Sequence, residues 1–315
     1  MLSAQTVLRD DELEIADVAC RHGRGRGATE LAGGRSSICF VRRGCFARTG
    51  HAGEDLLDPF SVFFVGAGEE QRYDHPHDGG DDCTAFFLDD ELLASLWGGD
   101  PTLPSAPLHG APELDLEHRL LLAAARGGGP AEALAERAIL LIAGVLELSD
   151  RSRAGAGRPS PSQSHEALAA KARESLAADP DQSLPELSRS LATSPHHLSR
   201  IFRAVTGHTI SRHRMRLRAR AALERLADGE QNLSRLAAEL GFADQSHLCR
   251  VVRAETGSTP AALRAALGKR MTSTPYDLGY APVRPGTRRA LSRDGRRGGS
   301  RLAGNADPAA HHHRS

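Results

Sequence analysis

The sequence predicts a small N-terminal β-barrel or sandwich followed by a helical hairpin, and then an all-α C-terminal domain with two helix-turn-helix units. The chain has 315 residues, which is enough for two domains of ordinary size. Short apolar runs between residues 36 and 88 are broken by glycine and proline, as in strands joined by turns. Between residues 165 and 268 the apolar residues recur every three or four positions, as in helices.

The composition is that of a globular protein, with 40% hydrophobic and 25% charged residues, and it excludes collagen, a coiled coil and wholesale disorder. The formal net charge of zero hides an unequal division. Residues 1–163 contain 15 Lys+Arg and 26 Asp+Glu, a net charge of −11, whereas residues 164–315 contain 25 and 14, a net charge of +11. This asymmetry predicts a C-terminal half that binds a polyanion, with double-stranded DNA as the expected partner.

The cysteine pattern and the N-terminus predict a cytoplasmic protein. The five cysteines form no C-x-x-C pair, which indicates neither a disulfide framework nor a zinc ribbon. The first 20 residues lack the basic and apolar regions of a signal peptide, and no stretch approaches the roughly 18 apolar residues of a membrane span. We therefore expect no membrane partner.

Residues 1–112 are assigned to the β domain. Its three clearest apolar segments are residues 37–49, 58–73 and 81–88, and Gly44 and the glycines at 66 and 68 mark turns between strands. Strands packed this closely along the chain favour a barrel or a sandwich.

Residues 113–148 are predicted to form a helical hairpin, interrupted by the break at residues 127–130. Its second helix carries a broad apolar stripe, formed by Leu134, Ala138, Leu141, Ile142 and Val145. Such a stripe can pack on the barrel or on a second copy of the chain, and we expect the hairpin to form a homodimer. Residues 149–164 have the composition of a flexible linker, and residues 269–315, with 10 Lys+Arg against 3 Asp, that of a disordered basic tail.

One pattern occurs twice in the helical region, at residues 183–207 and at residues 232–257. Each copy has a short apolar-faced segment, a turn of three to four residues, and a longer amphipathic segment. Ser194 and Asp244 are residue types that cap helices, and each precedes the second segment. The pattern predicts two helix-turn-helix units.

The second helix of each unit presents polar residues of the types that contact bases and phosphates. The candidate DNA-binding residues are His196, His197, Ser199, Arg200 and Arg203 in the first unit and Gln245, Ser246, His247, Arg250 and Arg253 in the second. Residues 209–227 contain neither glycine nor proline, and as a helix they would span about 28 Å. That length approaches the roughly 34 Å of one DNA turn, so one chain could read two successive major-groove segments.

Residues 183–264 resemble the DNA-binding domain of the AraC/XylS family of bacterial transcription regulators, in the order and spacing of both units and of the helix between them. The resemblance places the family's reading positions at His196, Ser199 and Arg200, and at Gln245, Ser246, His247 and Arg250. His213 and Val252 depart from the aromatic residues usual at two packing positions. RNA polymerase and an unidentified small-molecule effector are candidate partners of such a regulator.

Residues 58–88 are similar to the cupin-like barrel that precedes the DNA-binding domain in many members of this family. The similarity includes the run of His75, Pro76, Gly79, Gly80, Asp81 and Cys83. It implies a regulatory or dimerising domain and does not identify an effector or its binding residues. The predicted function is a sequence-specific DNA-binding transcription regulator, either activator or repressor, that is not an enzyme.

The alternative is a metal-dependent cupin enzyme fused to a DNA-targeting domain. The ligand types of a cupin metal site are offered by His75, His77, Glu69, Glu70, Asp81 and Cys83. A cupin metal site also needs a later histidine, and the next ones, His109 and His118, lie beyond the apparent barrel. The sequence therefore predicts no metal, no cofactor and no catalytic residue. It favours a tight turn at residues 79–80 whose free amides bond Asp81, and a buried thiol at Cys83.

Overall fold

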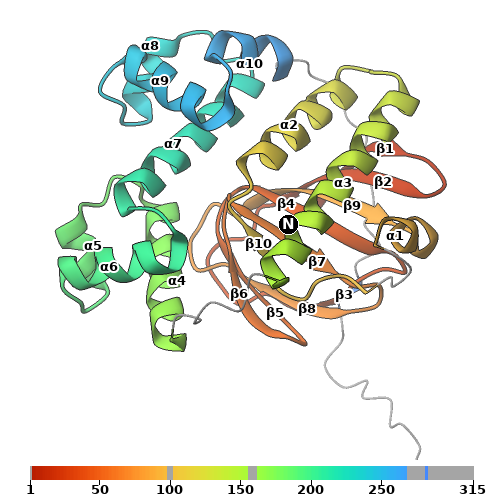
Figure 1. The fold of residues 1–315 in the computed structure, drawn as a ribbon, viewed down its shortest axis with the longest axis horizontal. Helices are drawn as coiled ribbons and strands as arrows, with labels where there is room; N and C mark the ends of the chain where they lie inside the picture. Colours follow the sequence, from red (N-terminus) through yellow and green to blue (C-terminus); the bar gives the residue numbers. More distant parts are fainter. Residues whose placement is uncertain (1, 98–101, 155–161, 268–280, 283–315) are drawn as a thin grey trace, which may run out of the picture. The chain divides into compact units, whose positions relative to one another are not determined.

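The computed structural model describes residues 2–97, 102–154, 162–267 and 281–282 (Figure 1). The predicted architecture is confirmed, because a domain of two antiparallel sheets is followed by a helical hairpin and a helical C-terminal region. Within the described residues, no helix is both long enough and apolar enough to span a membrane.

Two antiparallel sheets form the barrel. One has the strand order β1-β2-β9-β4-β7-β10, and the other has the order β11-β3-β8-β5-β6. The strands are β1 Leu2–Arg9, β2 Leu13–Cys20, β3 Thr29–Leu31, β4 Ser36–Arg43, β5 Phe46–Gly50, β6 Gly53–Leu57, β7 Ser61–Val65, β8 Glu70–Asp74, β9 Asp81–Leu88, β10 Leu108–His109 and β11 Ala281–Pro282.

The central strands β4, β7 and β9 are buried along almost their whole length. Since alternate residues of a strand point to opposite sides of a sheet, both faces of these strands are buried. In β4, for example, Cys39 and Val41 join the core between the two sheets. Ile38 and Phe40 join a second core on the opposite face. The six-stranded sheet therefore needs a cover on its outer side.

That cover is the helical hairpin, formed by α2 (Pro112–Arg126) and α3 (Ala131–Ala154), which lies over the six-stranded sheet in Figure 1. The short helix α1 (Asp90–Trp97) contributes to the same core. All five residues of the predicted apolar stripe, Leu134, Ala138, Leu141, Ile142 and Val145, are buried in it. Because the stripe packs on the barrel, the expected homodimer has to use another surface; Leu140 of α3, 65% exposed, is a large apolar side chain outside the stripe.

The predicted secondary structure needs correction in four places. Strands begin at Leu2, well before residue 36, and α1 was not predicted. Helix α3 continues to Ala154, so residues 149–154 are helical and not part of a linker. In the segment predicted as a disordered tail, β11 pairs with β3. The rest of the predicted linker and tail, residues 155–161, 268–280 and 283–315, lies outside the described residues.

His118 joins helix α2 to the sheet as a neutral side chain. Its Nδ1 donates to the carbonyl oxygen of Asp115 at 3.0 Å, and its Nε2 accepts from the Thr84 hydroxyl at 3.2 Å. The ring stacks on Phe40 at a centroid distance of 4.5 Å. Burial lowers the pKa of His118 to about 3, against the opposing effect of the Asp115 carboxylate and with the help of the nearby Arg119 and Arg42.

The free energy of unfolding of the barrel should fall as the pH drops below about 6.5, because His118 takes up a proton there in the unfolded chain only. One such group contributes up to about 1.4 kcal/mol per pH unit, down to the folded-state pKa of about 3. His118→Gln should reduce this slope by about one proton. Denaturant titrations at a series of pH values can follow the fluorescence of Trp97, the single tryptophan. Equal slopes in the two proteins would show that His118 is protonated in the folded barrel.

Candidate nucleic-acid interface and barrel cavity

The C-terminal region contains two helix-turn-helix units joined by one long helix, as predicted. The first unit is α5 with α6, the second is α8 with α9, and α7 connects them. The helices are α4 Gln163–Ala178, α5 Leu184–Ser190, α6 Pro195–Thr206, α7 Ile210–Ala227, α8 Leu233–Glu239, α9 Gln245–Thr256 and α10 Pro260–Leu267.

The second helices of the two units, α6 and α9, have the same capping structure. Ser194 accepts a hydrogen bond from the backbone amide of His197 at 3.2 Å, and Asp244 accepts one from that of His247 at 2.7 Å. Both predicted N-caps are thus confirmed. Each helix has 12 residues and ends at a glycine with positive φ, Gly207 or Gly257. Because the caps lie at equivalent positions, the two helices begin and end at equivalent residues.

Apolar side chains fix one face of each of these helices and leave the other free. Leu198, Ile201 and Phe202 of α6 are buried, as are Leu248 and Val252 of α9. None of the ten candidate DNA-binding residues is buried. Exposed are His196, Arg200, Arg203, Gln245, Ser246, Arg250 and Arg253, and partly exposed are His197, Ser199 and His247.

Four of these ten side chains already have polar partners. Arg200 Nη2 lies 3.4 Å from Nδ1 of His197, on the same face of α6. Gln245 Oε1 accepts from the Ser234 hydroxyl at 2.7 Å, and His247 Nδ1 accepts from the backbone amide of Ala243 at 3.3 Å. These contacts orient the side chains at the start of each helix.

Helix α7 carries five arginines at alternate positions, and most of their side chains bind partners within the protein. They are Arg212, Arg214, Arg216, Arg218 and Arg220. Arg216 is buried and donates to Glu255 of α9 at 3.2 Å. Arg214 donates to the carbonyl oxygen of Gln182, and Arg218 donates to that of Gly241. Because Arg220 is also buried, Arg212 is the most exposed of the five. Few of them can therefore contact phosphate, as helical geometry predicts.

The two departures from the AraC/XylS pattern are filled packing positions. His213 is buried, packs edge-on against Phe202 at a centroid distance of 5.3 Å, and its Nδ1 lies 3.1 Å from Nε2 of His208. Burial lowers the pKa of His213 to about 3. Val252 is fully buried in the core of the second unit.

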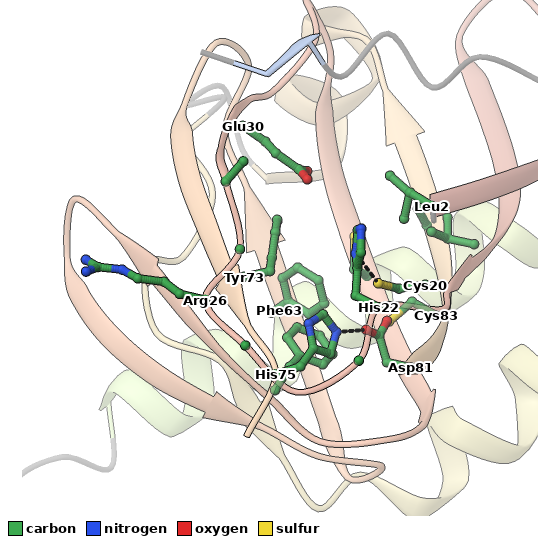
Figure 2. Close-up of a pocket in the computed structure, with 18 of the residues that line it drawn as sticks. Leu2, Cys20, His22, Arg26, Glu30, Phe63, Tyr73, His75, Asp81 and Cys83 are labelled. Atoms are coloured by element: carbon green, nitrogen blue, oxygen red, sulfur yellow. Dashed lines mark hydrogen bonds and ion pairs between the residues drawn. The ribbon is translucent and has the colours of Figure 1, made fainter. Parts of the chain in front are cut away.

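A cavity of about 400 Å³ lies inside the barrel (Figure 2). Its walls are largely aromatic and apolar, with Phe46, Phe63, Tyr73 and Phe87 among the lining residues. Glu30 also lines it, and burial raises the pKa of this carboxyl group. A cavity of this size, in which polar groups such as Arg24, Glu30 and Asp81 stand beside aromatic walls, is typical of small-molecule sites.

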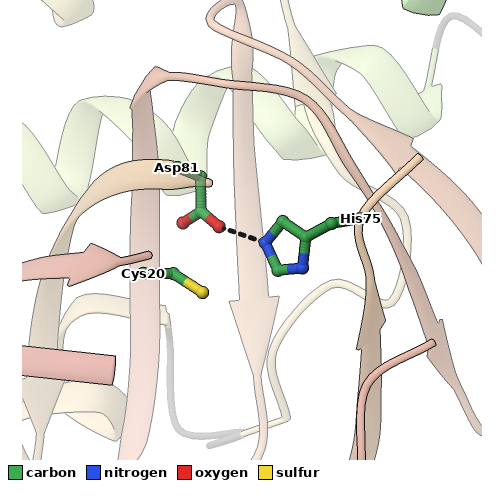
Figure 3. Close-up of side chains that lie close together, drawn as sticks. All are labelled: Cys20, His75 and Asp81. Atoms are coloured by element: carbon green, nitrogen blue, oxygen red, sulfur yellow. Dashed lines mark hydrogen bonds and ion pairs between the residues drawn. The ribbon is translucent and has the colours of Figure 1, made fainter. Parts of the chain in front are cut away.

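Three side chains that can hold a metal ion meet at one end of this cavity, and Figure 3 shows them directed toward one another. They are Cys20, the last residue of β2, Asp81, the first of β9, and His75, which follows β8. Each is buried, and their donor atoms all lie within 4.8 Å of one another. His75 Nε2 and Asp81 Oδ1 are 2.7 Å apart, and this hydrogen bond raises the pKa of His75 to about 10.

Residues 187–266 match a family model described as a helix-turn-helix domain. The C-terminal region of this chain is an AraC-type helix-turn-helix domain. The match begins within α5 and includes the rest of the first unit, the second unit and the helix between them. A comparison with curated proteins found no match in sequence.

Solved structures give more distant likenesses. ToxT from Vibrio cholerae, in the apo form of a single-residue variant, is 10% identical, with 82% of this chain and 99% of that chain covered and a TM-score of 0.39. A DNA-binding transcriptional dual regulator from Escherichia coli K-12 is 19% identical over 33% of this chain and 94% of that chain, with a TM-score of 0.30. The cupin domain of Cnp3 from Schizosaccharomyces pombe is 13% identical over 31% and 68%, with a TM-score of 0.27.

The residues that the sequence pattern suggested as metal ligands do not all lie together in the structure. His75 and Asp81 meet, but their third companion is Cys20, which the sequence analysis did not consider. Glu69 instead bonds His51 and the amide of Gly66, and His77 lies 3.5 Å from Glu174.

Two interpretations of nearby residues can also be judged. Asp81 does not bond the amides of the turn before it as predicted, because its carboxylate faces His75. Cys83 is buried as predicted, and burial raises the pKa of its thiol.

Gly80 allows Cys20 and Asp81 to approach, because its φ is +66° and an added Cβ would lie 1.9 Å from the carbonyl oxygen of Cys20. Gly80→Ala should therefore lower the free energy of unfolding of the barrel by about 2–3 kcal/mol. Gly33→Ala is the matched control, because nothing lies within 4 Å of its added Cβ, and it should change stability by less than about 0.5 kcal/mol. Denaturant unfolding followed by Trp97 fluorescence measures both; equal effects would contradict the role of Gly80.

Proposed function

We propose that the protein is a sequence-specific DNA-binding transcription regulator whose helices α6 and α9 read two successive major-groove segments. The observation that carries the proposal is the repetition of one unit, with equal helices, equal caps and equivalent polar faces. A single exposed polar helix face is ordinary, whereas two matched faces joined by one helix fit a repeated target.

The length of α7 supports this reading of DNA. The helix has 18 residues, which corresponds to about 27 Å at 1.5 Å per residue. One turn of B-DNA rises roughly 34 Å, so two units separated by such a helix suit neighbouring segments on one face of the duplex. The partners inside the domain that bind Arg214, Arg216 and Arg218 stiffen this connection.

The exposed residues supply both kinds of DNA contact. Arg200 and Arg250 occupy equivalent places on their helices, and arginine can donate two hydrogen bonds to guanine. Gln245 can pair in the same way with adenine. The remaining candidates, with histidine, serine and arginine side chains, suit phosphate and sugar contacts.

The barrel is the proposed control domain, with the cavity as the site of a small-molecule effector. Its volume of about 400 Å³ and its aromatic walls suit a compact, largely apolar molecule. A homodimer and an interaction with RNA polymerase remain predictions.

The alternative function, a metal-dependent cupin enzyme, requires a metal site. The structure partly fulfils this requirement, because three side chains of metal-ligand types lie together in the barrel. No arrangement among the described residues assigns it a substrate or a reaction. The metal measurements described below bear on that requirement without testing DNA binding.

Arg200→Ala and Arg250→Ala should each weaken binding to the preferred duplex by about 1–3 kcal/mol and relax the preference at one base position. The physical reason is the loss of a two-pronged hydrogen bond to a base edge. The measurement is the Kd of the full chain for a duplex that the wild type selects from a random library, beside a scrambled duplex, at one fixed salt concentration.

Two controls separate base reading from charge. Arg200→Lys keeps the positive charge but not the planar fork, so it should keep binding to scrambled DNA and lose preference. Arg137→Ala removes an exposed arginine of α3 and should change neither affinity. If Arg200→Ala weakened both duplexes equally, Arg200 would be a backbone contact, and a large drop in melting temperature would place it in the core.

A further inference from the structure

The backbone holds Cys20, His75 and Asp81 in place independently of any side-chain contact between them. Cys20 and Asp81 are direct partners in the antiparallel pairing of β2 with β9. His75 exchanges two backbone hydrogen bonds with Gly25, each of 2.9 Å. A site built from such fixed positions needs little reorganisation when it binds a ligand.

We propose that Cys20, His75 and Asp81 bind a zinc ion at the end of the barrel cavity, with His22 as the fourth ligand. This site is distinct from the DNA-binding faces and does not depend on the function proposed for them. It also differs from the set that the sequence pattern suggested, which included neither Cys20 nor His22.

The donor set points to zinc by its chemistry. A thiolate, imidazoles and a carboxylate are the ligands that Zn²⁺ takes in tetrahedral sites, whereas Mg²⁺ and Ca²⁺ prefer oxygen alone. Two donors on one tetrahedral zinc ion lie about 3.5 Å apart, given bond lengths of about 2.0–2.3 Å. The present separations range from 2.7 Å between His75 and Asp81 up to 4.8 Å, so the side chains have to move by about one ångström, and these two groups have to move apart.

The charges balance when zinc binds. Bonds form from Zn²⁺ to the thiolate sulfur, the imidazole nitrogens and a carboxylate oxygen. The thiol proton of Cys20 and the proton between His75 and Asp81 pass to solvent. One thiolate and one carboxylate then neutralise the two charges of the ion. Because the site carries no net charge, burying it avoids the large penalty for an unpaired ion.

His22 completes the set of four. Its Nδ1 lies 3.2 Å from Sγ of Cys20, and its ring centroid is 6.2 Å from that of His75. His22 belongs to the segment 21–27, which returns across the cavity in Figure 2. Two hydrogen bonds fix this segment, from the amide of Arg24 to Asp78 at 2.7 Å and from that of Gly27 to Asp74 at 2.9 Å.

An ion pair without metal accounts for His75 and Asp81 but not for Cys20. The 2.7 Å hydrogen bond already satisfies those two groups. The thiol of Cys20 has His22 on one side, and its sulfur lies within 4.8 Å of the donor atoms of His75 and Asp81 on the other. By contrast, the polar partner of Cys39 in the same cavity is a serine hydroxyl, 3.8 Å away. A thiol between two imidazoles and a carboxylate is the arrangement of a zinc ligand.

The test uses the full-length chain with His311, His312 and His313 replaced by serine, so that this histidine run cannot bind metal. The protein is stripped with a chelator, loaded with Zn²⁺, desalted and assayed for zinc by elemental analysis. We expect about one zinc ion per chain. Loading with Co²⁺ should give the intense visible bands of a tetrahedral site and a thiolate-to-cobalt charge-transfer band.

Variants then assign the ligands. Cys20→Ser should abolish the charge-transfer band and weaken zinc binding at least about 100-fold in competition with a chromophoric chelator. Asp81→Asn should weaken it similarly, and His22→Ala by about tenfold or more. Cys39→Ser, in the same cavity, and Cys249→Ser, in α9, are the matched controls and should keep both the zinc ion and the band. Far-UV circular dichroism and Trp97 fluorescence verify that each variant is folded.

The proposal is overturned if the stripped wild-type barrel takes up no zinc, or if the cobalt protein lacks a thiolate charge-transfer band. It is equally overturned if a folded Cys20→Ser variant binds zinc as tightly as the parent. DNA binding by the same samples provides a separate readout, so a failed zinc site leaves the proposed regulator function to its own test.

Discussion

The fold depends on a six-stranded sheet whose central strands must be buried on both faces. Alternate residues of β4, β7 and β9 point into two different apolar cores, so neither face tolerates water. The second sheet covers one face and the helical hairpin covers the other. This division explains why the apolar stripe of α3 is wide without being an interface, since the sheet beneath it has to be sealed within the chain.

The same sheet also explains where chemistry is possible in the barrel. Its outer face is filled by helices, whereas the space between the sheets is only partly filled by side chains and leaves the cavity. The polar cluster of Cys20, His75 and Asp81 enters this space at strand ends. Cys20 and Asp81 stand at such ends, and His75 immediately follows one. Along β2 and β9, the residues of the apolar core and the residues of the polar cluster therefore occupy different positions.

The helical half was predictable in detail because its signals are local. Caps such as Ser194 and Asp244, and the glycines that follow each second helix, lie within a few residues of the helices that they define. The barrel was predictable only as a class. Its first hairpin lies outside the apolar runs on which the strand prediction rested, and β1 pairs with β2 along most of its length. The cluster of Cys20, His75 and Asp81 depends on pairings about 60 residues apart, which no local pattern reveals. The hydrogen bond from Arg216 to Glu255, which holds α7 to α9, likewise joins residues that are far apart in the sequence.

The segment 21–27 encloses one side of the cavity through polar contacts and not through apolar packing. Its hydrogen bonds to Asp74, Asp78 and the backbone of His75 are of a kind that water can replace at modest cost. Much of the remaining cavity wall consists of side chains of the core between the two sheets, such as Phe46, Phe63 and Cys83, which separate only when the barrel unfolds. Local opening of these seven residues therefore breaks fewer contacts than unfolding of the barrel does. One side of the cavity can in this way open while the core between the sheets stays folded.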